Sequence, residues 1–251
     1  MRLLIDGDLL LYRATAAVEK EIRWDEDNHV LFSNAQEAFQ QFTSSVAQIV
    51  ETLDCDNVVI CFTKGQSFRT KLYPQYKQSR INVRKPLAFQ RVREMAEDTW
   101  YCMSKPNLEA DDVMGIIATR HRDTVIVSQD KDMKTIPCKL YRDGELVTIS
   151  EAEADYNWMF QTLTGDSTDG YPGCPGIGAV KAEALLKAKK HPEQSDEDVR
   201  ATYWQRVVAA YERAGLSVED ALVQARLARI LRNTDWDGEK GEVILWEPKA
   251  Q

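Results

Sequence analysis

Acidic residues are concentrated at two boundaries between a predicted helix and a predicted strand. Five carboxylates fall within 24 residues: Glu109, Asp111, Asp112, Asp130 and Asp132. The apolar run at 113–118 is helical in character and the run at 124–128 is typical of a buried strand, so three acids precede a helix and two follow a strand. Ligands of an open α/β sheet bind beyond the carboxyl ends of its strands. Acids gathered there repel one another unless a cation holds them, and carboxylate oxygens favour Mg2+ or Mn2+.

Helix capping is the simpler explanation for any one of these acids, because an Asp at a helix start accepts hydrogen bonds from the first backbone N–H groups. Capping does not explain the whole set, since further acids occur at two other boundaries. Asp6 ends a predicted strand at 2–5, and Asp166 and Asp169 lie in a glycine-rich stretch. Eight carboxylates exceed what one Mg2+ usually takes, so the set predicts two ions.

Composition is that of an ordinary globular protein. The 251 residues are 43% hydrophobic and 29% charged, which suits one large domain or one domain with a helical annex. No apolar run approaches the roughly 20 residues of a membrane span, and the early charges predict a first strand rather than a signal peptide. The five cysteines and three histidines form no zinc pattern, which favours reduced thiols in a cytoplasm.

Basic residues are concentrated in one segment of an acidic chain. The net charge of −8 by itself argues against a nucleic-acid partner. Residues 64–93 nevertheless contain nine Lys or Arg and no Asp or Glu. A charge run is often only a solvated face, but thirty residues without an acid favour a phosphate-binding surface.

Strands and helices are predicted to alternate over the first 149 residues. Runs rich in Val and Ile predict strands at 2–5, 57–62, 100–103 and 124–128, with a hairpin at 138–149. Apolar residues at helical spacing predict helices at 9–18, 35–53, 86–98 and 110–121. Two stretches lack a period and are predicted as a loop at 19–33 and an exposed, mobile segment at 63–85. This alternation predicts an α/β fold with a mostly parallel sheet flanked by helices.

From residue 150 the pattern becomes helical. Helices are predicted at 151–163, 178–187, 198–214 and 218–231, followed by an edge strand at 242–246. Five glycines and two prolines at 165–178 exclude a regular element there. A glycine-rich loop that opens a helix presents N–H groups suited to a phosphate, although most single Gly-x-Gly motifs are plain turns.

Five motifs occur along the chain, in the order Asp6-Gly7-Asp8, Tyr76-Lys77-x-x-Arg80, Glu109-Ala-Asp111-Asp112, Asp130-x-Asp132 and Gly165-Asp166-x-x-Asp169 with Gly176-Ile-Gly178. In these motifs and their order the chain resembles the 5′-nuclease superfamily, which contains flap endonucleases and the 5′→3′ exonuclease domain of bacterial DNA polymerase I. The chain most resembles podophage exonucleases, through 130–137, 165–171 and the Ala-Arg-Ile-Leu-Arg motif at 228–232. The resemblance implies a PIN-like catalytic core at 1–149 with a helical arch at 64–99. It also implies a helical DNA-binding region at 150–251, packed on the core, with a helix–three-turn–helix at 151–188.

The resemblance also implies roles for single residues. A first metal ion would be held by Glu109, Asp111 and Asp112, with Asp6 near it. A second would be served by Asp130, Asp132, Asp166 and Asp169. Lys77 and Arg80, at the base of the arch, would steer and stabilise the scissile phosphate. These two residues and the eight acids are the expected catalytic residues.

Further residues are expected to bind DNA. Tyr76 resembles a ring that stacks on a terminal base, an interaction worth about 1–3 kcal/mol per base; the alternative is a packed surface tyrosine. Gly176, Gly178 and Lys181 resemble a turn that grips the duplex backbone, often with a K+ ion. The basic segment adds Arg69, Lys71, Arg84 and Lys85 to the expected contacts.

One position departs from the family. After the second strand the family has an Asp, and by the spacing to Arg69 that place is taken by Lys64. An ammonium there would lie against the metal site, repelling Mg2+ or pairing with the acids. We therefore hypothesise an impaired enzyme, with an engineered substitution as one origin; the alternatives are an alignment shifted by one residue and a site that tolerates the change.

The resemblance favours a Mg2+-dependent 5′→3′ exonuclease and flap endonuclease, with Mn2+ as a substitute. Expected substrates are DNA with 5′ ends, flaps or branches, and RNA–DNA hybrids. The chain is expected to be a monomer without a membrane partner, acting in phage replication in the cytoplasm of an infected bacterium. The alternatives are a non-catalytic binder of branched DNA and a PIN-type ribonuclease, and the glycine-rich turn disfavours the latter.

Overall fold

The computed structural model describes residues 1–187 and 195–248, and its centre is a six-stranded sheet in the order β5-β4-β1-β6-β7-β8. Five strands run parallel: β1 (Arg2–Asp6), β4 (Val58–Cys61), β5 (Cys102–Met103), β6 (Thr124–Val127) and β7 (Lys139–Arg142). The last strand, β8 (Glu145–Thr148), pairs antiparallel with β7 as a hairpin. The predicted mostly parallel sheet is therefore confirmed.

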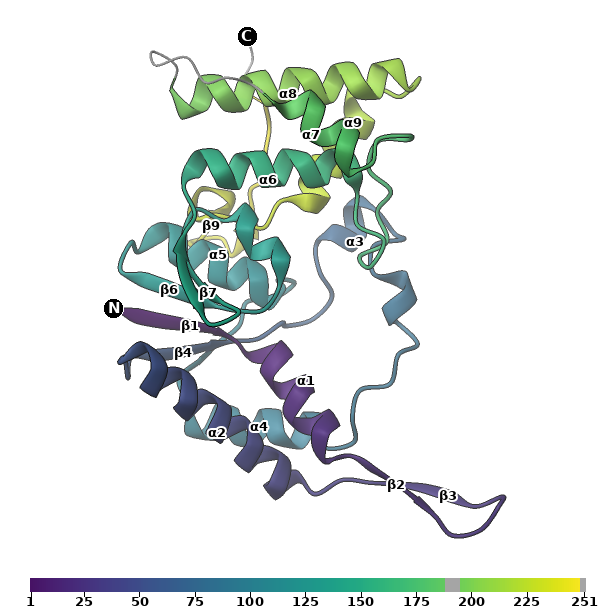
Figure 1. The fold of residues 1–251 in the computed structure, drawn as a ribbon, viewed down its shortest axis with the longest axis vertical. Coiled ribbons are helices and arrows are strands. Elements are labelled where there is room, and N and C mark those ends of the chain that lie inside the picture. Colours follow the sequence, from purple (N-terminus) through teal and green to yellow (C-terminus); the bar gives the residue numbers. More distant parts are fainter. Residues whose placement is uncertain (188–194, 249–251) are drawn as a thin grey trace.

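Helices cover both faces of this sheet (Figure 1). Because successive side chains of a strand point to opposite faces, Leu3 and Ile5 of β1 pack beneath one set of helices and Leu4 beneath another. The first set is α1 (Gly7–Val18), α2 (Ala35–Leu53) and α4 (Phe89–Thr99). On the other face α5 (Ala110–Arg120) packs together with Ile230 and Leu231 from near the end of the chain.

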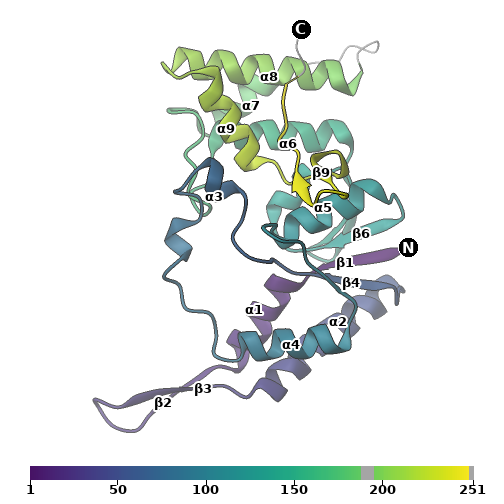
Figure 2. The same ribbon diagram turned by 180° about the vertical axis from the view of Figure 1, so that it is seen from behind.

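A helical region lies at one end of the molecule (Figures 1 and 2). It consists of α6 (Glu151–Thr164), α7 (Ala179–Leu186), α8 (Asp196–Arg213) and α9 (Val218–Ala228). These helices enclose a separate apolar core that includes Trp158 and Tyr211. In the described ranges no helix is long and apolar enough to cross a membrane.

Several sequence predictions about elements were wrong. The predicted loop at 19–33 contains a hairpin of β2 (Lys20–Arg23) and β3 (His29–Phe32) that projects from the body (Figure 1). Helix α9 ends at Ala228 rather than at residue 231. The predicted edge strand at 242–246 is only β10 (Glu242–Val243), which pairs with β9 (Trp236–Asp237) apart from the main sheet.

The basic segment contains little regular structure. Between β4 and α4 it forms only the one-turn helix α3 (Arg69–Leu72) and the 3-10 turn η1 (Gln78–Arg80), so the helical form implied for an arch is restricted to these turns and α4. It runs from the helical region down to α4 along one side of the molecule (Figure 2). Residue 188 of the predicted helix–three-turn–helix and residues 249–251 lie outside the described residues.

Candidate active site

A groove of about 900 Å3 opens beside the carboxyl ends of β1 and β6. Its acidic lining is Asp6, Asp8, Glu109, Asp111 and Asp130. Its basic lining is Arg13, Lys77, Arg80, Arg84, Lys85, Lys131 and Arg142. The groove therefore brings acids from three of the predicted acidic motifs, and four of the predicted basic side chains, together at the edge where the sheet topology places ligands; Asp166 and Asp169 do not line it.

The acids reach the groove because they stand where elements begin and end. Asp6 closes β1 and caps α1: its Oδ1 accepts a hydrogen bond from the Leu9 N–H at 3.1 Å, and its Oδ2 from the Ser128 hydroxyl at 2.8 Å. Glu109 is the N-cap of α5, which puts Asp111 in the first helical turn. Capping and a metal-binding role are compatible for these residues, because each carboxylate oxygen has two lone pairs and a single hydrogen bond occupies only one of them.

Charge repulsion is evident in the pKa values of three carboxyl groups. Burial, together with Asp8 and Asp130, raises the pKa of Asp6 to about 6. Burial, Asp6 and Asp130 raise the pKa of Asp111 well above its usual range. Burial and Asp130 raise the pKa of Asp132 to about 6. Each shift means that the negative charge is costly in this site, and a bound cation would remove that cost.

Lysine and arginine side chains hold the other carboxylates. Lys77 pairs with Glu109, Arg80 lies 2.9 Å from Asp169, and Lys131 lies 2.9 Å from Asp166. Burial opposes ionisation of Glu109, but Lys77 and Arg69 outweigh it and lower the pKa of that carboxyl to about 2. With these partners in place, no three His, Cys, Asp or Glu side chains in the described ranges converge as a metal site.

The donor set nevertheless fits hard divalent cations. Glu109 and Asp111 line both the groove and a small adjoining cavity that Asp132 and Asp169 also line. Six of the eight carboxylates predicted for two ions, all but Asp112 and Asp166, therefore line these two adjoining spaces. Metal binding would require Glu109, Asp166 and Asp169 to exchange their present cationic partners for the ions.

The structure contradicts two predictions about the acidic cluster and the basic segment. Arg69, predicted to contact DNA, is 2% exposed and forms a bidentate ion pair with Asp112, at 2.7 and 2.8 Å. Asp112, predicted to hold metal, is 0% exposed and both of its oxygens are engaged by Arg69. Neither side chain reaches the groove.

Tyr76 is also placed differently from the prediction. Its ring is 4% exposed and lies against Tyr171, with centroids 6.4 Å apart. Its hydroxyl is 3.0 Å from both Glu109 Oε2 and Asp169 Oδ2. In this conformation the ring cannot stack on a base, and its hydroxyl instead bridges acids assigned to the two predicted metal sites.

Lys64 is exposed and does not line the groove. Its backbone N–H donates to the Leu108 carbonyl at 3.1 Å, and among the residues described its ammonium makes no ion pair. The expectation that this ammonium lies against the acids was therefore wrong.

Asp8 is a groove residue that the sequence reasoning missed. Its Oδ2 accepts a hydrogen bond from the Thr63 N–H at 2.9 Å, and the Thr63 hydroxyl accepts one from Ala110 at the start of α5. Asp8 thereby ties the end of β4 to the two helix starts that carry the acids. The signal was available, since Asp8 stands two residues from Asp6 in the same Asp-Gly-Asp turn.

The other predicted DNA contacts lie on exposed surface. Lys71, Arg84 and Lys85 are exposed, and Arg84 forms an ion pair with Glu19. In the glycine-rich turn the Lys181 ammonium donates to the Gly176 carbonyl at 2.9 Å, and Gly178 caps α7. The structure thus gathers Gly176, Gly178 and Lys181 at one helix start.

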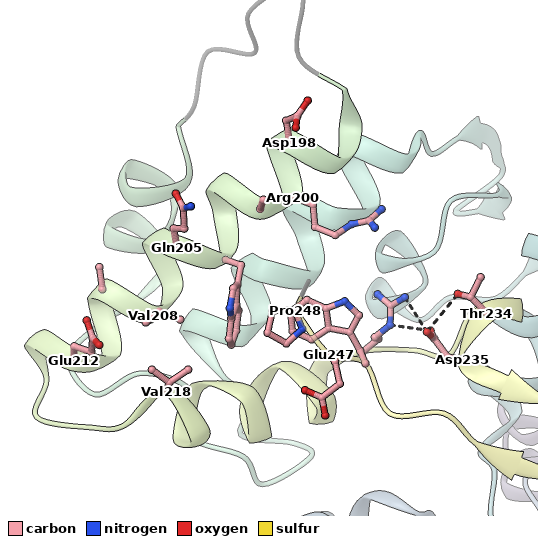
Figure 3. Close-up of a pocket in the computed structure, with 15 residues that line it drawn as sticks. Asp198, Arg200, Gln205, Val208, Glu212, Val218, Thr234, Asp235, Glu247 and Pro248 are labelled. Carbon is pink, nitrogen blue, oxygen red and sulfur yellow. Dashed lines mark hydrogen bonds and ion pairs between the residues drawn. The ribbon is translucent and has the colours of Figure 1, made fainter. Parts of the chain in front are cut away.

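A second cavity, of about 800 Å3, lies among α8, α9 and the C-terminal segment (Figure 3). Trp204 and Trp246 meet edge to face there, with centroids 5.1 Å apart. The side chain of Arg229 pairs with Asp235 at its border. None of the predicted site residues lines this cavity.

Comparison with known proteins agrees with the fold. A model of the 5′-3′ exonuclease N-terminal resolvase-like domain matches residues 1–157. The exonuclease of Escherichia phage T7 is 31% identical over 98% of this chain and 93% of its own length. The exodeoxyribonuclease of Enterobacteria phage T3 is 30% identical over 99% of this chain and 93% of its own length.

Solved structures share the fold. The bacteriophage T5 D15 flap endonuclease, solved as a pseudo-enzyme–product complex with DNA and metal ions, has a TM-score of 0.55 at 15% identity, covering 89% of this chain and 98% of that one. The T5 5′-exonuclease with bound zinc ions also has a TM-score of 0.55, at 14% identity, covering 91% and 98%. Together with the family model and the phage relatives, this fold defines a resolvase-like α/β nuclease, a hydrolase of phosphodiester bonds. Within that class the chain belongs to the 5′-3′ exonuclease family.

Proposed function

We propose that this chain is a metal-dependent 5′→3′ exonuclease and flap endonuclease that acts on DNA during phage replication. The observation that carries the proposal is the groove, in which buried carboxylates with raised pKa values face a row of lysines and arginines. The T7, T3 and T5 relatives, named as exonucleases or a flap endonuclease, support the same substrate class. The acids suit divalent cations, and the basic wall suits the phosphates of a nucleic-acid strand.

Two groups of carboxylates would hold two Mg2+ ions. Asp6, Glu109 and Asp111 would serve the first ion. Asp130, Asp132, Asp166 and Asp169 would serve the second. When bound, such ions supply Lewis-acid activation of water and of the phosphate.

The basic residues would act as exchangeable partners. Lys77 and Arg80 now neutralise Glu109 and Asp169. If Glu109 and Asp169 bound metal, the side chains of Lys77 and Arg80 would be free beside the groove to pair with a phosphate. The ion pairs therefore hold Lys77 and Arg80 over the site before substrate arrives. The turn at Gly176 and Gly178 would contact the duplex backbone away from the groove. A K+ ion bound there would compete with the Lys181 ammonium for the Gly176 carbonyl.

The test is cleavage of a labelled 5′-flap duplex in Mg2+ by the chain as given and by Lys64→Asp. We expect both to cut, because Lys64 lies outside the groove and Asp8 supplies a carboxylate within it. EDTA and Asp111→Asn should each abolish cutting. Cutting by the Lys64→Asp variant alone would mean that Lys64 abolishes catalysis and that the chain as given is a non-catalytic DNA-binding protein. No cutting by either form, in Mg2+ or Mn2+, would overturn the proposed activity.

A further inference from the structure

Arg69 uses all of its hydrogen-bonding capacity inside the protein. Nη1 donates to Glu109 Oε2 at 3.0 Å and to Asp112 Oδ2 at 2.7 Å, and Nη2 donates to Asp112 Oδ1 at 2.8 Å. Two backbone carbonyls take the remaining N–H groups: Nε donates to Leu227 at 3.0 Å and Nη2 to Arg229 at 2.6 Å. A guanidinium has five N–H donors, and all five are matched here.

These contacts join two helix ends of opposite polarity. Glu109 and Asp112 stand at the start of α5, whose free N–H groups favour negative charge. Leu227 lies in the last turn of α9 and Arg229 directly follows that helix, where carbonyls without helical partners favour positive charge. Arg69 lies between them and satisfies both ends at once.

The carbonyl side of this junction is itself held in place. The Arg229 side chain pairs with Asp235, with Nε 2.8 Å from Oδ2, and its guanidinium lies 4.4 Å from the centre of the Trp158 ring. Two residues on, the Leu231 N–H donates to Asp112 Oδ1 at 3.1 Å. The Ala-Arg-Ile-Leu-Arg motif at 228–232 thus contacts the acidic motif at the start of α5, through Arg69 and directly at Asp112.

We propose that Arg69 is a positioning residue that makes the metal-binding geometry of Glu109 depend on the C-terminal end of α9. The inference rests on the proposed metal-dependent function. Of the two Glu109 oxygens, Oε2 receives Arg69 and the Tyr76 hydroxyl, while Oε1 meets Lys77 at the groove. Arg69 therefore holds Glu109 Oε2 on the side away from the groove, and Oε1 remains on the groove side, where it could bind an ion.

A lysine cannot replace this arginine. An ammonium has three donors on one atom and lacks the planar fork that reaches a carboxylate and two carbonyls together. Arg69→Lys would keep the buried charge opposite Asp112 but leave at least one carbonyl unpaired, and it would weaken the charged contact with Glu109 Oε2, which only the Ser67 and Tyr76 hydroxyls would then hold firmly. Residues that orient a metal ligand typically contribute 10–100-fold to metal affinity or activity.

The experiment measures Mn2+ binding by isothermal titration calorimetry and flap cleavage in Mg2+ for the full chain and Arg69→Lys. We expect metal affinity and kcat to fall at least about tenfold while KM for DNA stays within about twofold, because Arg69 is buried away from substrate. Arg200→Lys is the matched control. Arg200 also pairs with a buried Asp, with Nε 2.6 Å from Asp155, but lies in the helical region, and its variant should bind Mn2+ as the parent does.

Circular dichroism establishes whether each variant folds. If Arg69→Lys does not, the neutral pair Arg69→Gln/Asp112→Asn is measured instead, since it leaves no unpaired buried charge. Metal affinity and kcat equal to those of the parent in a folded variant would overturn the inference. A parent chain that neither binds Mn2+ nor cuts DNA would instead contradict the proposed function.

Discussion

At the scale of single residues, Asp6 and Asp132 should make metal binding depend on pH. Both have a pKa of about 6 in the metal-free protein, raised mainly by burial. A carboxyl whose folded pKa is raised destabilises the fold increasingly as pH rises through the interval from its unfolded value to about 6. Metal ions bind the deprotonated form and remove this cost. The increase in Tm on adding Mg2+ should therefore be larger at pH 7.5 than at pH 5.

Differential scanning fluorimetry with and without Mg2+ at the two pH values checks this expectation. Asp6→Asn/Asp132→Asn supplies the control, because its Tm increase should be small at both pH values. An equal increase for the parent at pH 5 and pH 7.5 would show that these two groups do not limit metal binding.

The sequence predicted most acids of the groove correctly but misassigned Arg69 and Asp112. The acids of the groove were predictable because each stands at an element boundary. Arg69 and Asp112 were misassigned because motif position does not reveal burial: the carbonyl that receives Arg69 Nε is 158 residues away in the chain. The sequence shows a basic segment and an acidic cluster, but it does not show that Arg69 of the one forms an ion pair with Asp112 of the other.

At the scale of elements, Gly115 in α5 should resist a substitution that normally stabilises a helix. Gly→Ala inside a helix is usually favourable by about 1 kcal/mol. Here a methyl group at 115 would overlap the Leu231 carbonyl and crowd Ile230. Such overpacking costs about 1–3 kcal/mol, so Gly115→Ala should lower the free energy of unfolding measured in urea. Gly238→Ala, whose methyl group would lie 4.0 Å from Trp236 Nε1, should change it by less than about 0.5 kcal/mol. A more stable Gly115→Ala would contradict the close packing of α5 on 230–231.

Elements with a buried face were predicted well and elements without one were not. Helix α2 has the predicted bounds, because apolar residues at helical spacing meet the core. All eight residues of β2 and β3 are exposed, so no alternation marks them as strands. The helix predicted to reach 231 ends at Ala228, and beyond it the Arg229 carbonyl and the Leu231 N–H serve Arg69 and Asp112.

At the scale of the whole molecule, residues from beyond the predicted boundary at 149/150 also pack into the core of the sheet. Ile230 and Leu231 are buried in the cluster that covers α5 and one face of the sheet. Arg232 reaches back to the Thr135 carbonyl as well as to Asp155. We therefore propose that the regions 1–149 and 150–251 fold as one cooperative unit, and that a fragment of residues 1–149 does not fold alone.

Equilibrium unfolding can test this cooperativity with two probes. Trp158, Trp204 and Trp246 contact one another edge to face in the helical region, so half of the six tryptophans report on that part, whereas far-ultraviolet circular dichroism follows all helices and strands. One transition with coincident midpoints is expected if the two parts unfold together. The fragment 1–149 should show no cooperative transition, because it leaves Arg69 without its two carbonyl partners and exposes the face that Ile230 and Leu231 cover. Separate midpoints, or a fragment that unfolds cooperatively, would mean that the catalytic core is autonomous and that its contacts with 227–232 are not required for folding.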